Sequence, residues 1–184
     1  MIELAFGDWT ARMSIGEPRL LYADQARGGA VVEQFDLDDR DSQLFIMELH
    51  RYRNIPEHGK SPSLIVAQRY SPSTSGFNPG VLITDDGTTL FIGAGTRVLA
   101  YDLLTSTRLW EETANFGFWN WQQHGAVVLM AAELEFAAWT SRGDKLWAMS
   151  VEPPWYYSVV VDQVHMDMMG SKMIFPVTGG PSKM

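Results

Sequence analysis

The sequence predicts an all-β protein of antiparallel meander sheets, arranged as a propeller-like stack or a sandwich. Short apolar runs rich in Val, Ile, Phe, Tyr and Trp alternate with Gly, Asp, Ser and Pro, which is typical of strands joined by turns. Few windows keep the period of a helix. A segment also recurs after about 38 residues in the second half of the chain, as it does in repeat folds.

In the first half we expect strands at apolar or β-branched runs that are bounded by turn-forming residues. These runs cover residues 3–6, 9–15, 20–23, 30–37, 43–49 and 63–68. The segment 48–57, ELHRYRNIPE, fits a strand extension, a helical turn or a loop, and it is left open. The segment 36–41, DLDDRD, lacks the Gly and final Glu of a helix–loop–helix calcium site, so an acidic hairpin turn is expected.

The second half predicts a denser series of strands. They cover residues 80–84, 89–93, 97–103, 108–112, 126–132, 135–140, 145–151, 158–161, 163–168 and 172–177. Gly lies between apolar runs in DDGT (85–88), SRGD (141–144) and GSK (170–172). Because a positive φ costs Gly little, these turns predict antiparallel hairpins. Pro153 and Pro154 donate no ladder hydrogen bonds, so EPPWYY (152–157) should be an extended edge or loop.

An internal repeat predicts the packing of this half. Residues 90–112 align with residues 128–150, so that Arg108-Leu109-Trp110 meets Lys145-Leu146-Trp147. Fainter copies occur at 164–175 and 31–45. Repeats of this size, made of three or four strands, are typical of propeller blades. We therefore expect Trp110 and Trp147 to fill equivalent places between neighbouring sheets.

The repeat resembles the blade repeat of quinoprotein-like (PQQ-type) β-propellers. In VLAYDLLTSTRLWE (98–111), the order of Val, Ala, Asp, Thr and Trp follows the family's pattern. The resemblance covers about residues 80–150 and implies the geometry of blades. Ser106 stands where the family has Gly, and the second copy lacks the Asp. Four blades of this size would just close a ring, whereas an incomplete propeller fits the irregular spacing better.

Length and composition favour a single folded domain. The 184 residues are 46% hydrophobic and 20% charged, which is ordinary for a soluble protein with a buried core. We expect one all-β domain over 1–184, with a less repetitive part (1–79) and a propeller-like repeat part (80–184). The boundary falls at YSPSTSGFNPG (70–80), which fits a linker or a long functional loop.

Charge and cysteine content exclude several classes of function. Fourteen basic against 22 acidic residues leave a net charge of −8, which disfavours binding to nucleic acid. There is no cysteine, so disulfides and thiolate chemistry are excluded and a cytoplasmic location is compatible. The apolar runs are too short to span a membrane, and Glu3 and Asp8 interrupt any signal peptide.

Aromatic residues near the C-terminal end are the first candidate binding site. Trp119 and Trp121 stand at i and i+2, which predicts that both lie on one face of a strand. Trp155 and Tyr156 follow the two prolines, where rings on a loop or sheet edge are suited to anchoring a partner. The competing interpretation, which the repeat favours, is that most of these rings fill the core.

A set of polar residues is the second candidate. His165 and Asp167 project from one face of a strand, and Glu133 and Glu135 share another. Together with His124, these imidazoles and carboxylates have the chemistry of a metal site or of a general acid and base. No His-x-His or His-Glu-x-x-His spacing occurs, so a solvated sheet face is the preferred interpretation.

We therefore expect a non-catalytic binding module that carries no cofactor and binds no metal. It would engage a protein partner, or a second copy of itself, through the exposed aromatics Trp119, Trp121, Trp155 and Tyr156. The alternative is a small-molecule or metal-dependent enzyme that uses His124, Glu133, His165 and Asp167. No nucleophile elbow or phosphate-binding loop is present.

Overall fold

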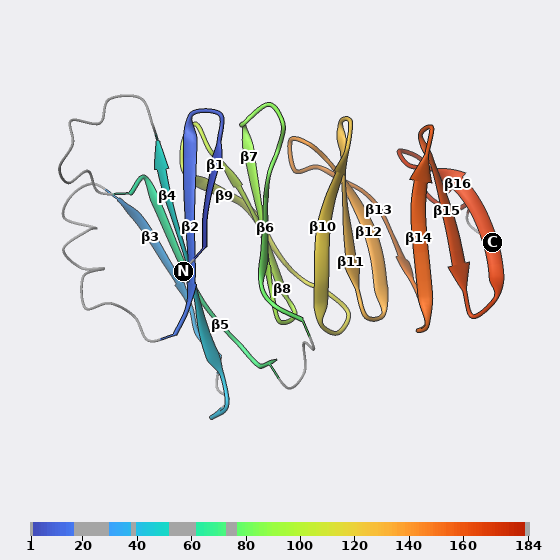
Figure 1. The fold of residues 1–184 in the computed structure, drawn as a ribbon, viewed down its shortest axis with the longest axis horizontal. Helices are drawn as coiled ribbons and strands as arrows, with labels where there is room; N and C mark the ends of the chain where they lie inside the picture. Colours follow the sequence, from blue (N-terminus) through green and yellow to red (C-terminus); the bar gives the residue numbers. More distant parts are fainter. Residues whose placement is uncertain (1, 17–29, 38–39, 52–61, 73–76, 183–184) are drawn as a thin grey trace.

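Sixteen β-strands make up the fold in a computed structural model that describes residues 2–16, 30–37, 40–51, 62–72 and 77–182 (Figure 1). The all-β prediction is confirmed for these residues. The expected strand at 20–23, and parts of 36–41 and 48–57, lie outside them. Within the described residues, no helix is long and apolar enough to cross a membrane.

The strands form four sheets, named A to D in chain order. Sheet A has the order β1 (Ile2–Phe6), β2 (Trp9–Ile15), β4 (Gln43–Arg51), β5 (Leu64–Tyr70), β3 (Val31–Phe35). Sheet B has the order β6 (Gly80–Ile83), β7 (Thr89–Ala94), β8 (Arg97–Asp102), β9 (Thr107–Thr113). Sheet C has the order β10 (Phe118–His124), β11 (Val127–Ala132), β12 (Glu135–Thr140), β13 (Lys145–Ser150). Sheet D has the order β14 (Trp155–Val160), β15 (Gln163–Met168), β16 (Ser171–Pro176).

Sheets B, C and D are antiparallel meanders, as predicted, but sheet A is not. The chain pattern predicts antiparallel pairing throughout, and this is wrong for β3, which runs parallel to β5. Side chains alternate between the two faces in parallel and antiparallel strands alike, so the alternation in the sequence does not distinguish them. β10 lies outside the expected strand ranges, although Trp119 and Trp121 were expected to lie on a strand.

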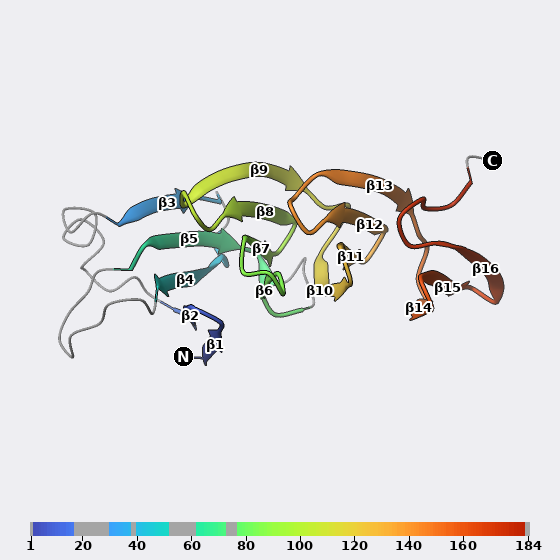
Figure 2. The ribbon, with the colours of Figure 1, turned by 90° about the horizontal axis from the view of Figure 1, so that it is seen from above.

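The four sheets stand side by side along the long axis of the molecule and fan into an open arc (Figures 1 and 2). β3, β9 and β13 line one border of the arc, which we call the outer border, and β1, β6, β10 and β14 line the inner border. Sheets A and D lie at opposite ends (Figure 2). The described residues thus form a propeller-like stack without a closed ring.

Three layers of buried side chains hold the stack together, one at each junction. The layer between A and B includes Met47, Leu64, Leu90, Ile92 and Tyr101. The layer between B and C includes Phe91, Val98, Phe118, Met130 and Trp139. The layer between C and D includes Leu129, Phe136, Trp155, Val164 and Phe175. Both faces of B and C are therefore buried, which explains why β7 and β11 read as continuous apolar runs.

The two repeated tryptophans occupy equivalent places, as the repeat predicts. Trp110 lies on β9, the outer strand of sheet B, and its indole N–H donates to the Gly143 carbonyl of sheet C at 2.6 Å. Trp147 lies on β13, the outer strand of sheet C, and donates to the Val177 carbonyl beyond β16 at 2.8 Å. Each ring thus joins its own sheet to the turn that follows the third strand of the next sheet.

Ser106, which stands where the blade pattern has Gly, adopts the backbone conformation that favours glycine. Ser106 has a φ of 56°, in the left-handed region that favours glycine. Gly143, the matching residue of the second copy, has a φ of 92°. The turn between the third and fourth strands therefore keeps a left-handed backbone in both copies, although only one copy has a glycine there.

Candidate functional site

The outer face of sheet D, the one that points away from sheet C, carries several exposed large apolar side chains. Val164, Met166 and Phe175 pack against sheet C. Because side chains alternate along a strand, the intervening residues point the other way. Tyr156, Val160 and Ile174 lie on this outer face and are 71%, 52% and 63% exposed.

A shallow depression of about 500 Å³ lies on this face, between β14, β15 and β16. The central strand of this face, β15, contributes the polar side chains His165 and Asp167, which are paired with Ile174 and Lys172 of β16. The Asp167 carboxylate accepts a hydrogen bond from the Gly170 N–H at 2.9 Å. The face thus has a polar middle strand between two strands that carry exposed apolar side chains, and protein-binding surfaces have such mixed compositions.

The corresponding faces of sheets B and C are covered. Sheet B presents Phe91 and Ala100 to sheet C, and sheet C presents Phe136 and Leu129 to sheet D, and all four side chains are fully buried. Among the described residues no sheet covers the outer face of D. The outer face of D is therefore equivalent to faces that the next sheet buries in B and C, but it is itself exposed.

The predicted pair Trp119 and Trp121 does not share a face. Trp119 packs in the layer between C and D, whereas Trp121 packs in the layer between B and C. The register of β10 against β11 shifts between Phe118 and Asn120. Such a bulge adds one residue to the strand, so residues on either side of it no longer alternate regularly. The prediction of a shared face is wrong for this reason.

Trp155 is buried, and its ring belongs to the core between sheets C and D. The ring stacks on Trp119 with centroids 5.1 Å apart, and its N–H donates to the Glu133 carbonyl at 3.2 Å. Tyr157 lies beside it and donates its hydroxyl to Gln122 at 2.8 Å. Burial raises the pKa of Tyr157 to about 12, so this hydroxyl stays protonated. Of the four predicted aromatics, Tyr156 is the exposed one, whereas Trp119 and Trp121 are partly buried.

The polar candidates are not brought together. His124 ends β10, whereas Glu133 follows β11 beside Gly117, at the other end of the same hairpin. Six residues of strand separate these ends, a span of roughly 20 Å. His165 and Asp167 lie on the outer face of sheet D, away from sheet C. Among the described residues no three His, Asp or Glu side chains are grouped to hold a metal ion. Burial lowers the pKa of His124.

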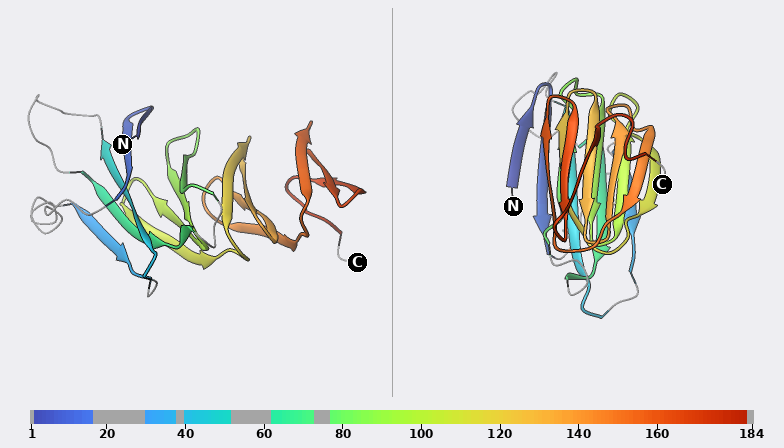
Figure 3. Two further views of the ribbon diagram at one scale, coloured as in Figure 1. Left: turned by 60° about the horizontal axis from the view of Figure 1, so that its bottom comes forward. Right: turned by 90° about the vertical axis from the view of Figure 1, so that its right-hand side faces the viewer.

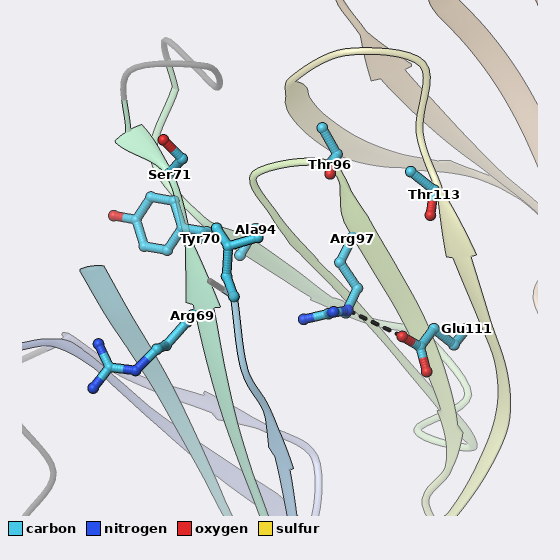
Figure 4. A pocket seen from close by; sticks show the side chains of 9 residues that line it. Arg69, Tyr70, Ser71, Ala94, Thr96, Arg97, Glu111 and Thr113 are labelled. Carbon is cyan, nitrogen blue, oxygen red and sulfur yellow. Dashed lines mark hydrogen bonds and ion pairs between the residues drawn. The ribbon is translucent and has the colours of Figure 1, made fainter. Parts of the chain in front are cut away.

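A second pocket, of about 260 Å³, lies at the junction of sheets A and B (Figure 4). Arg69, Tyr70 and Ser71 line it from β5 and its end, and Arg97 lines it from β8. The Arg97 guanidinium is bound to Glu111 at 3.0 Å and lies over the Phe35 ring at 5.0 Å. Its charge is thus already compensated within the protein, and the pocket is a polar part of the junction.

Beside this pocket a buried tyrosine joins β3 to sheet B. Tyr101 is fully buried and donates its hydroxyl to the Glu33 carboxylate at 2.7 Å. Arg108 lies 3.7 Å from the same carboxylate and binds Glu111 at 2.9 Å. Burial, together with the hydrogen bond to Glu33, raises the pKa of Tyr101, so the phenol remains a neutral donor. The network fixes the outer strand of sheet A to the next sheet.

We expect Tyr101→Phe to lower the free energy of unfolding by about 1.5–3 kcal/mol, because the half-buried Glu33 carboxylate loses a hydrogen-bond donor. Urea unfolding curves of the two proteins measure the difference. Arg97→Lys is a control that keeps a positive charge at the neighbouring site and should cost less. A Tyr101→Phe protein with unchanged stability would show that the hydrogen bond contributes nothing.

Comparison with known proteins gives a match of fold alone. The chain matches no protein-family model and no curated protein sequence. Among solved structures, the β-propeller domain of the Trilobed protease from Pyrococcus furiosus has a TM-score of 0.48 at 8% identity, covering 90% of this chain and 47% of that one. BamB from Moraxella catarrhalis has a TM-score of 0.41 at 13% identity, covering 80% and 58%. Hydrazine synthase from Kuenenia stuttgartiensis has a TM-score of 0.39 at 12% identity, covering 81% and 50%. The chain thus spans about half the length of these structures.

Proposed function

We propose that the protein is a non-catalytic interaction module that binds a protein partner on the outer face of sheet D. The observation that carries the proposal is the exposure of Tyr156, Val160 and Ile174 on a face whose counterparts in sheets B and C are buried. Exposed apolar side chains gathered on one sheet face are typical of protein-binding sites. Trp119 and Trp155 support this face from behind, since their stacked rings fix β14 against sheet C.

The partner is expected to present the apolar face of a β-sheet. Every junction within this chain is made by two such faces whose aliphatic and aromatic side chains interlock. The outer face of D offers a flat aromatic ring at Tyr156 on β14, an aliphatic side chain at Ile174 on β16, and both signs of charge at Asp167 and Lys172. It therefore suits a mixed, mainly apolar protein surface and offers no concentration of positive charge for a polyanion.

Ile174→Asp is expected to lower the affinity for the partner by at least about tenfold, because it replaces a contacting apolar side chain of the proposed interface by a charge. The protein is immobilised, and its captured partners are compared with those of the variant by mass spectrometry. Leu104→Asp is the control for exposure, since Leu104 is 65% exposed in the turn between β8 and β9 of sheet B and Ile174 is 63% exposed.

The expected result is one protein that wild type and Leu104→Asp retain and Ile174→Asp loses. A photo-cross-linking residue at position 156 should then attach to that protein. Equal capture by all three proteins would contradict the proposal. Trp155 is not suited to this test, because removal of a buried ring disturbs folding as well as binding.

A further inference from the structure

The opposite end of the molecule has an edge strand with an unusual combination of properties. Among the described residues, β1 is the end strand of sheet A and pairs with β2 on one side alone. All five of its residues are exposed. Ile2, Leu4 and Phe6 are 61%, 45% and 42% exposed. Proteins usually protect such edges with charge, proline or a bulge, since unpaired N–H and C=O groups pair readily with another strand.

β1 protrudes beyond the rest of the stack. Sheet A has five strands where B and C have four, and the view along the stack shows β1 standing outside the layer of the other sheets (Figure 3). Ile2, Leu4 and Phe6 are paired with Met13, Ala11 and Trp9, so they lie on the face of sheet A that packs against B. Their exposure shows that sheet B does not reach far enough to cover them.

The sequence of β1 is complementary to itself in one antiparallel register. With Leu4 opposite Leu4 of a second copy, Ile2 faces Phe6 and Glu3 faces Ala5, so apolar side chains meet and no like charges are opposed. A shift by one residue sets Leu4 against Glu3. A shift by two residues in one direction opposes Glu3 to Glu3. In the favoured register, each Glu3 also keeps its ion pair with Arg12 of its own chain, at 2.9 Å.

We propose that two copies of the protein associate by antiparallel pairing of β1 with β1, which joins their A sheets into one continuous sheet of ten strands. The two-fold axis passes between the Leu4 residues, and closed two-fold pairing is the commonest form of homo-oligomer. The dimer leaves both D sheets free at its far ends. It is independent of the proposed function, because it uses the opposite end of the stack.

Leu4→Cys tests the proposal, because the protein has no cysteine of its own. Residues directly opposite in an antiparallel pair have Cα atoms about 4.5–5.5 Å apart, within the range that a disulfide spans. Mild oxidation of Leu4→Cys should therefore give a covalent dimer. Ala5→Cys is the matched control. Ala5 is on the same strand and is also exposed, but it faces Glu3 of the second copy, so a cysteine there should cross-link far less.

Charge variants of the same residue give an independent readout of the association itself. Leu4→Lys and Leu4→Glu each oppose like charges across the axis, so each should be monomeric in analytical ultracentrifugation at concentrations where wild type is dimeric. An equal mixture of the two should recover a heterodimer. A monomeric wild type, or equal cross-linking of Leu4→Cys and Ala5→Cys, would overturn the proposal. Ile174→Asp should leave the dimer intact, so the two surfaces are tested separately.

Discussion

Replacement of Trp139 by Ala is expected to lower the free energy of unfolding by about 3–5 kcal/mol, the range for removal of a fully buried large aromatic side chain. Trp139 is fully buried in the layer between sheets B and C. Its ring stacks on Trp110 with centroids 5.3 Å apart and meets Trp121 edge-on at 5.6 Å. Its loss would leave a cavity between three strands of two sheets. Thermal and urea unfolding measure the effect.

Trp139→Phe separates the packing of the ring from its polar atom. Within the described residues the Trp139 indole N–H is buried and has no hydrogen-bond partner. A buried donor without a partner is unfavourable, so its removal offsets part of the lost volume. We expect Trp139→Phe to cost clearly less than Trp139→Ala. Equal losses for the two variants would contradict this account of the junction.

The positions of the repeated tryptophans were predictable, because similar sheets stacked on one another place equivalent residues at equivalent points of their junctions. Trp110 and Trp147 are aligned in the sequence repeat, and in the fold each donates a hydrogen bond to the equivalent turn of the next sheet. The parallel strand β3 was not predictable in the same way. Its alternation of side chains fits either direction of pairing, and the direction depends on a connection that composition does not specify.

The candidate site was predictable in part. Tyr156 was expected to be exposed on an edge or loop, and it is exposed, but on a strand that begins at Trp155. The two prolines before Trp155 favoured an edge or loop, so the burial of Trp155 at the start of β14 was not foreseen. The bulge at Trp119 was also hidden, since no Gly or Pro marks it, and it alone decides that Trp119 and Trp121 point in opposite directions.

Gly93→Ala is the second large effect that we expect, because the space for a side chain at this position is already occupied. A Cβ at Gly93 would lie 2.5 Å from the ring of Phe118, which belongs to the next sheet. That ring is buried and packed against Trp121, with centroids 5.4 Å apart. Gly93 is paired with Gly80 across β6 and β7. The two glycines leave space for the ring. Overpacking of such a site lowers the free energy of unfolding by about 1–3 kcal/mol or more.

Two further variants show whether the collision with Phe118 is the cause. Gly80→Ala is the milder control, since its Cβ would lie 3.1 Å from the ring edge and should cost less than Gly93→Ala. Phe118→Leu shortens the side chain, so the double variant Gly93→Ala, Phe118→Leu should be more stable than the sum of the single losses predicts. Additive losses in this cycle would show that Gly93 is needed for some reason other than the ring it accommodates. A favourable coupling would show that the packing of the Phe118 ring against the backbone of Gly80 and Gly93 stabilises the junction between sheets B and C, in addition to the stacked tryptophans.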